Sequence, residues 1–108
     1  MQTKMQGMEK QDGNSGEILN PDRKYLLKLY ITGSAARSMS AINNITEICK
    51  NNLVDYELQI IDIYENPSFA KEAQIIAVPT LIRVLPSPKR RIIGDLASAE
   101  KVLTCIEN

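Results

Sequence analysis

The feature that most constrains this chain is a pair of short apolar segments bounded by prolines. Val78-Pro79-Thr80 opens an apolar run that ends at Leu85, and Pro86-Ser87-Pro88 separates it from a second run, Arg90–Ile93. Proline fixes φ and has no N–H to donate, so it is found at strand ends and in turns rather than inside central strands. We therefore expect strands at 80–85 and 90–93, joined by the proline turn as an antiparallel hairpin.

The residues ahead of this hairpin follow a strand, helix, strand pattern. Tyr25–Ile31 is apolar at nearly every position, which is typical of a strand covered on both faces, and Tyr56–Ile63 gives a second strand. Between them, residues 35–51 carry apolar side chains at helical spacing, namely Ala41, Ile42, Ile45, Ile48 and Cys49. A crossover of this length predicts a parallel βαβ unit.

Two further helices complete the predicted order. Asn66-Pro67 begins one helix, because proline suits a first helical turn, and Pro79 ends it. Its inner face is expected to hold Phe69, Ala70, Ala73 and Ile76. Ser98 can cap the last helix, whose inward residues are Val102, Leu103 and Ile106. The resulting order, βαβαββα, predicts an α/β thioredoxin-like domain over residues 24–108.

Composition limits the function classes that are open to the chain. Residues 1–23 are polar and predict a disordered N-terminal tail. Lysine plus arginine and aspartate plus glutamate both number 13, and this balance argues against nucleic-acid binding. No apolar run is long enough for a signal peptide or a membrane span, so we expect a cytoplasmic protein without membrane contact.

The sequence offers little that could support catalysis. Histidine is absent, which excludes a Cys/His zinc site and a histidine base, and Cys49 is best interpreted as a buried core thiol. The place of the nucleophilic cysteine in thioredoxin-like enzymes, just after the first strand, reads Gly33-Ser34-Ala35-Ala36-Arg37. Asp62 and Asp95 are expected to cap turns. The chain therefore predicts no catalytic residues, no cofactor and no metal, and an interaction role.

Several segments resemble a known family. The run Leu85-Pro86-Ser87-Pro88-Lys89-Arg90-Arg91-Ile92-Ile93-Gly94-Asp95-Leu96, together with Lys28–Gly33, Tyr56–Asp62, Asn66-Pro67 and Val78–Leu81, resembles KaiB, the small clock protein of cyanobacteria and its bacterial relatives. The likeness covers about residues 24–103. Sensor domains of the SasA kinase type share the fold but not the Arg-Arg-Ile-Ile-Gly-Asp-Leu run.

The resemblance implies a non-enzymatic regulator that binds a KaiC-type ring ATPase, captures KaiA and competes with a SasA-type kinase. It also implies exchange between a thioredoxin-like monomer and a tetrameric ground state, in which the chain from about Asn66 is rearranged. Pro79, Pro86 and Pro88 supply joints that isomerise slowly, with Gly94 and Asp95 beside them. The plain alternative is that these prolines shape one fixed hairpin.

Three departures from the family pattern modify these expectations. The proline turn contains Ser87, and Cys105 and Glu107 stand where clock members tend to carry glycine and aspartate. Both replacements favour helix in the last segment, so we expect a thioredoxin-like resting state with weak or absent tetramers. Glu57 and Gln59 lie on the strand that helps to hold KaiA in clock members, and they argue against KaiA capture. The oligomeric state, whether monomer, dimer or tetramer, stays open.

For contact with the ATPase, the sequence points to four cations, Arg83, Arg90, Arg91 and Lys71, because charged pairs orient partners and speed association. An ordinary solvated hairpin face would explain the same residues. The alternatives from other classes are a sensor-type domain related to the SasA kinase and a redox protein of thioredoxin fold.

Overall fold

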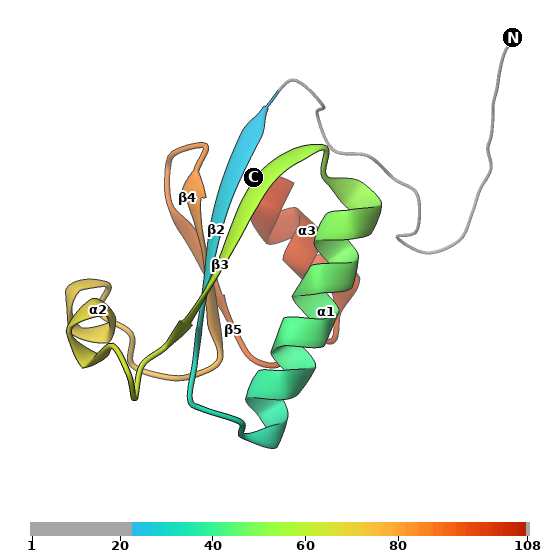
Figure 1. Ribbon diagram of the computed structural model, residues 1–108. Coiled ribbons are helices and arrows are strands. Elements are labelled where there is room, and N and C mark those ends of the chain that lie inside the picture. Colours follow the sequence, from blue (N-terminus) through green and yellow to red (C-terminus); the bar gives the residue numbers. More distant parts are fainter. Residues whose placement is uncertain (1–22, 108) are drawn as a thin grey trace, which may run out of the picture.

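The computed structural model describes residues 23–107, so the predicted tail, apart from Arg23, lies outside the described residues. Figure 1 shows one sheet with helices on both of its faces. In chain order the elements are β2 (Lys24–Ile31), α1 (Ala36–Asn52), β3 (Asp55–Asp62), α2 (Pro67–Glu72), β4 (Thr80–Leu85), β5 (Arg90–Ile93) and α3 (Ala99–Glu107). The predicted order βαβαββα is confirmed.

The strand order in the sheet is β3-β2-β4-β5. β2 runs parallel to β3, with Leu27 opposite Leu58, and antiparallel to β4, with Leu29 opposite Leu81. β4 and β5 form the expected antiparallel hairpin. The peptide bonds before Pro79, Pro86 and Pro88 are cis. Within residues 23–107, no helix has the length and apolar character that crossing a bilayer requires.

The main core lies between the sheet and the pair α1 and α3, which cover the same face (Figure 1). Side chains from alternate strand positions meet the apolar stripes of the two helices here, as the period of two in strands requires. The core includes Leu27, Leu29, Ile45, Leu81, Val102 and Ile106, all fully buried. The inward residues predicted for the last helix are therefore correct.

The opposite face of the sheet is covered only in part, by the short helix α2 (Figure 1). A small second cluster, Tyr30, Ile61 and Ile82, packs there against Ala73 and Ile75. The expectation that the first strand is covered on both faces is thus wrong for its first half, where Lys28 is only half-buried on this side. A six-residue helix is too short to shield a whole sheet face.

α2 ends at Glu72, well before Pro79, so the predicted end of this helix is wrong. Gln74 takes a left-handed conformation, with φ of 56°. The N–H of Ile75 donates to the Ala70 carbonyl at 2.9 Å, and the N–H of Gln74 donates to the Lys71 carbonyl at 3.1 Å. This pair of bonds is a Schellman ending, which stops a helix without proline.

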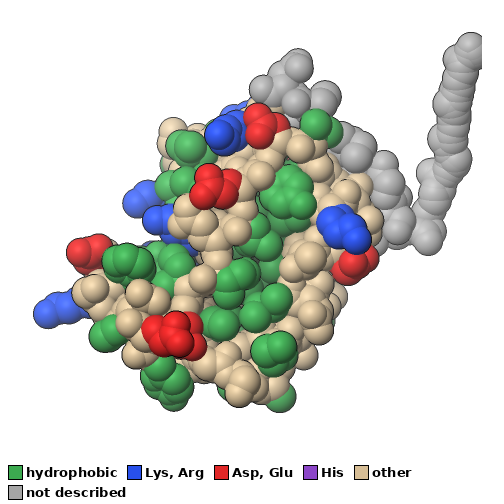
Figure 2. Space-filling model, viewed as in Figure 1, with side chains coloured by type: hydrophobic (Ala, Val, Ile, Leu, Met, Phe, Trp, Pro, Cys, Tyr) green, Lys and Arg blue, Asp and Glu red, His purple; other side chains and the backbone are tan. Residues whose placement is uncertain are grey.

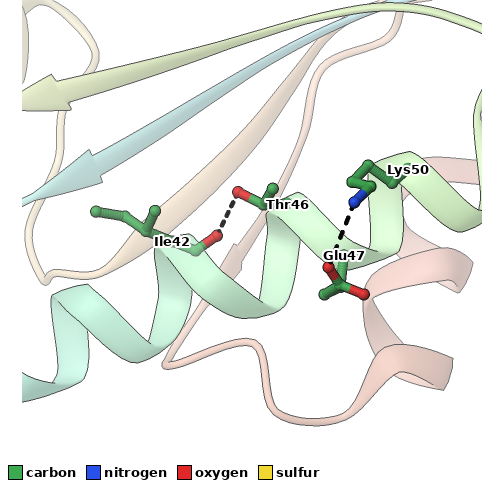
Figure 3. A network of polar contacts seen from close by, with 4 residues as sticks. All are labelled: Ile42, Thr46, Glu47 and Lys50. Carbon is green, nitrogen blue, oxygen red and sulfur yellow. Dashed lines mark hydrogen bonds and ion pairs between the residues drawn. The ribbon is translucent and has the colours of Figure 1, made fainter.

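The outer face of α1 is solvated. Thr46 Oγ1 donates to the Ile42 carbonyl at 2.7 Å, one turn earlier, and Lys50 Nζ lies 4.0 Å from Glu47 Oε2 (Figure 3). Both charged side chains are more than 60% exposed, at 64% and 67%. Ion pairs this exposed contribute little to stability. We therefore expect the polar contacts on this outer face of α1 to add little to the stability of the fold.

Candidate docking surface at the corner beside the second helix

Three loops meet at the end of the sheet where β2 and β3 finish and β4 begins. Gly33, after β2, has φ of 48°, and a Cβ placed on it would lie 3.7 Å from Cδ2 of Tyr64, in the loop after β3. The Thr32 N–H donates to Ser38 Oγ at 3.1 Å, which fixes the start of α1. The Gly94 N–H donates to the Pro79 carbonyl at 2.9 Å and ties the third loop to the end of β5.

This end of the sheet is where a thioredoxin-like enzyme places its nucleophilic cysteine. Here the loop contains Gly33 and Ser34, and the two thiols lie elsewhere, in α1 and α3. Cys49 is fully buried, and burial raises the pKa of its thiol to about 12. Burial also raises the pKa of the half-buried Cys105 thiol, against the opposing effect of the Arg83 guanidinium. Both thiols are protonated near neutral pH, and the prediction of a buried core thiol at Cys49 is confirmed.

The raised pKa of Cys49 leads to a prediction about stability at high pH. The folded protein holds this proton more tightly than the unfolded chain, so the thiol contributes stability that is fully present below pH 9 and is lost as the pH rises toward 12. The urea unfolding free energy of the wild type should therefore fall more steeply over this range than that of Cys49→Ala. Parallel curves for the two proteins would contradict the prediction.

The two carboxylates singled out in the sequence serve local turns. Asp62 Oδ1 accepts a hydrogen bond from the Tyr64 N–H at 2.9 Å, and Asp95 Oδ1 accepts one from the Ala97 N–H at 3.1 Å. The Asp95 carbonyl also accepts from Asn44 Nδ2 at 2.8 Å, which ties the loop after β5 to α1. The prediction that both aspartates cap turns is confirmed. Gly94, with φ of 129°, provides the backbone conformation that this loop needs.

Three exposed hydrophobic side chains lie in α2 or in the loops on either side of it. Tyr64 is 76% exposed, Phe69 48% and Ile76 88%. We call these three residues the α2 corner, and Figure 2 shows hydrophobic side chains clustered around α2. The expectation that Ile76 lies on the inner face of the helix is wrong, because the Schellman ending turns the chain before Ile76, whereas Phe69 lies in α2 and borders the sheet face but stays half-exposed. Exposed apolar groups of this kind mark interaction surfaces.

Arg83 does not lie on the surface, and its predicted role as a partner contact is corrected. It is 2% exposed and points from β4 toward the end of α3. Its Nη1 donates to the Ile106 carbonyl at 2.7 Å and its Nη2 to the Pro88 carbonyl at 2.6 Å. Burial lowers the pKa of this guanidinium, and the neighbouring Arg90 acts in the same direction. Side chains alternate along a strand, and this one falls on the core face.

The other three predicted cations are exposed. Arg91 extends toward α2, where its Nη1 and Nη2 donate to the carbonyls of Gln74 and Ala73 at 3.1 and 3.0 Å. It therefore holds the end of α2 against β5 while one side stays open to solvent. Lys71 lies in the last turn of α2, and Arg90 lies on β5 with its side chain on the opposite sheet face from Arg91. The structure thus places Lys71 on α2 and fixes Arg91 against the end of the same helix, whereas Arg90 lies on the other sheet face.

The residues assigned to fold switching fall in four places. Pro79 precedes β4, Pro86 and Pro88 form the hairpin turn, and the remaining four lie in the loop after β5 and in α3, namely Gly94, Asp95, Cys105 and Glu107. Cys105 and Glu107 are helical, in line with the expected preference. The sequence did not predict the packing of Tyr64 on Gly33, although a glycine two residues after a buried strand is a signal of close approach by another side chain.

The fold is that of a thioredoxin-like α/β domain, and the loop after its first strand, where such an enzyme carries its nucleophilic cysteine, holds Gly33 and Ser34 instead. Solved structures agree on the fold. Mitochondrial thioredoxin 3 from Saccharomyces cerevisiae superposes with a TM-score of 0.63 at 18% identity, over 79% of this chain and 78% of that one. The N-terminal domain of SasA from Synechococcus elongatus gives 0.61 at 18% identity, over 82% and 89%.

The sequence comparison is more specific. The KaiB domain model matches residues 28–107, and the chain therefore belongs to the KaiB family. It is 51% identical to circadian clock protein KaiB3 from Synechocystis sp. over 74% of this chain and 79% of that protein. It is 48% identical to a circadian clock oscillator protein KaiB from Prochlorococcus marinus over 75% of this chain and 78% of that protein. The resemblance seen in the sequence is confirmed.

Proposed function

We propose that this protein is a non-enzymatic regulator that binds a KaiC-type ring ATPase and modulates its phosphorylation cycle, in the cytoplasm. Membership of the KaiB family supports the partner, since the relatives are named circadian clock proteins. The observation that carries the proposal is the α2 corner, whose side chains Tyr64, Phe69 and Ile76 are exposed, with Tyr64 lying against Gly33 in the loop that lacks the redox cysteine. A scaffold with an apolar docking corner and protonated thiols suits binding rather than electron transfer.

Two cations near α2 could orient an acidic surface of the ATPase. Lys71 lies in the last turn of α2, and Arg91 is fixed by its hydrogen bonds to the end of this helix. Held cations orient an acidic partner and raise the association rate more than they raise affinity. Arg90 lies on the other face of the hairpin, so it cannot contact the same part of the ATPase as Lys71 and Arg91. The family resemblance also implies competition with a SasA-type kinase. Such competition requires that this protein and the sensor domain of the kinase bind the same site on the ATPase.

The test is direct binding of the full chain to the KaiC homologue of its host, with phosphorylated and dephosphorylated mimics compared. We expect binding to one of these states, weakened by Lys71→Glu mainly through a slower association rate. Lys50→Glu, on the solvated face of α1, is the matched control and should bind as the wild type does. Absence of binding to every state of the ATPase, or turnover of a dithiol substrate by the purified protein, would overturn the proposal.

A further inference from the structure

A groove of about 630 Å³ lies between α2 and the part of the sheet that this helix leaves uncovered. Its floor is apolar, with the buried side chains of Tyr30, Ile61 and Ile82 beside the half-buried Val84. Phe69 of α2 lines the same space. Concave, mostly apolar spaces of roughly 300–1,000 Å³ are typical of small-molecule sites. The size and lining of this groove therefore suit a small ligand.

Cationic side chains outnumber acidic ones around the groove. Among the described residues that line it, the cations are Lys28, Lys89 and Arg91, and the acid is Glu72. Lys28 lies opposite Ile82 in the β2–β4 ladder, and Ile82 lies opposite Arg91 in the β4–β5 ladder. Because neighbouring strands are about 4.8 Å apart, the Cα atoms of Lys28 and Arg91 are separated by roughly 10 Å. Two side chains of this length can reach one anion above Ile82.

The guanidinium of Arg91 is held in position for such a contact. Its Nη1 and Nη2 donate to the carbonyls of Gln74 and Ala73 at 3.1 and 3.0 Å. The guanidinium fork carries further N–H donors, and the side chain is exposed, so an anion can be bound as well. Burial raises the pKa of the Tyr30 phenol, Arg91 lowers it and Glu72 raises it. Both charges therefore lie near the Tyr30 hydroxyl, which is a further possible donor to the ligand.

This face suits a small molecule better than a polypeptide segment. β2 and β4 lie inside the sheet, so their backbone N–H and C=O groups point to neighbouring strands on both sides. A peptide laid across the face would find no strand edge with which to pair. Its own backbone groups would be desolvated against Ile61 and Ile82 without partners, which costs free energy. A small molecule with an apolar body does not carry this cost.

We propose that this groove binds a small amphipathic anion, with its charged group between Lys28 and Arg91 and its aromatic or aliphatic body on the apolar floor. The charged group is a sulfonate, phosphate or carboxylate, because each accepts charge-assisted hydrogen bonds. Glu72 disfavours a second anionic group beside α2. The inference does not depend on the partner assigned above, since it rests on the groove alone.

The test measures the binding of two fluorescent dyes to the full chain. Anilinonaphthalene sulfonate is the anionic probe, and phenylnaphthylamine has the same aromatic body without the sulfonate. We expect the wild type to bind the anionic dye more tightly. In Lys28→Gln and in Arg91→Gln, this preference, expressed as the ratio of the two dissociation constants, should fall about fivefold or more. The ratio cancels any loosening of α2 that weakens both dyes alike. Lys50→Gln, on the outer face of α1, is the matched control and should keep the wild-type ratio.

Ile76→Ser separates the groove from the α2 corner, where exposed apolar side chains offer another surface to a dye. This variant should bind both dyes as the wild type does. Displacement of the anionic dye by naphthyl phosphate, and not by the same concentration of inorganic phosphate, would support the proposal by showing that the apolar body is needed.

Three results would overturn the proposal. The first is a ratio that Lys28→Gln and Arg91→Gln both leave unchanged. The second is loss of dye binding in Ile76→Ser, which would place the dye on the α2 corner. The third is displacement of the anionic dye by a short peptide of alternating leucine and glutamate at lower concentrations than naphthyl phosphate requires, which would assign the groove to a protein segment.

Discussion

Replacing Arg83 with methionine is expected to lower the free energy of unfolding by about 2–4 kcal/mol. The guanidinium holds the carbonyls of Ile106 and Pro88, at 2.7 and 2.6 Å, and so joins β4 to the end of α3 and to the proline turn. Methionine fills a similar volume but donates nothing, which leaves both carbonyls without that donor. The cost is limited because the buried Arg83 Nε has no partner among residues 23–107, so its desolvation is relieved.

Urea unfolding with linear extrapolation measures the effect, and amide exchange localises it. Exchange should accelerate at Thr104–Glu107, the last turn of α3, more than in the centre of α1. Arg90→Met is the matched control, because Arg90 is an exposed arginine directly opposite Arg83 in the hairpin, and its change should stay within about 0.5 kcal/mol. Equal losses for the two variants would show that Arg83 is not a buried structural tie.

Replacing Ile76 with glutamate is expected to weaken binding to the KaiC homologue roughly 30-fold or more, with the unfolding free energy unchanged within about 0.5 kcal/mol. Ile76 is 88% exposed, so it contributes little to the fold. In a complex it would be buried together with Phe69 and Tyr64, and a carboxylate there would be desolvated without a partner. Phe69→Glu should act in the same direction.

Val54→Glu provides the control for this surface. Val54 is 59% exposed and lies just before β3, at the end of that strand opposite the α2 corner. It should bind the ATPase as well as the wild type does, by titration calorimetry or surface-immobilised binding. If Ile76→Glu and Val54→Glu bind equally well, the α2 corner is not the docking surface, and the family partner must contact another face.

Much of the fold could be predicted from local pattern. The bounds of β4 and β5 follow from Pro79 and the proline turn, since proline excludes itself from central strands. The inward face of α3 follows from the helical spacing of Val102, Leu103 and Ile106. The Arg-Arg-Ile-Ile-Gly-Asp-Leu run predicted membership of the KaiB family, whereas amino-acid composition alone did not.

The candidate site was predicted less well, for two physical reasons. The length of α2 depends on a left-handed Gln74, a conformation that the residue type does not favour, so Ile76 was placed inside a helix and is exposed in a loop. The direction of Arg83 depends on register. Three arginines within nine residues look alike in a sequence, whereas pairing in the hairpin sends Arg83 into the core and Arg91 toward α2.

The sequence by itself determined the order of elements, the family and the lack of a thiol after the first strand, because these depend on residue type and spacing along the chain. Only the tertiary structure decided which cations are available to a partner, where the apolar corner lies and which half of the sheet stays open. Those properties depend on the sheet face to which each side chain points and on what packs against it, and residues distant in sequence fix both.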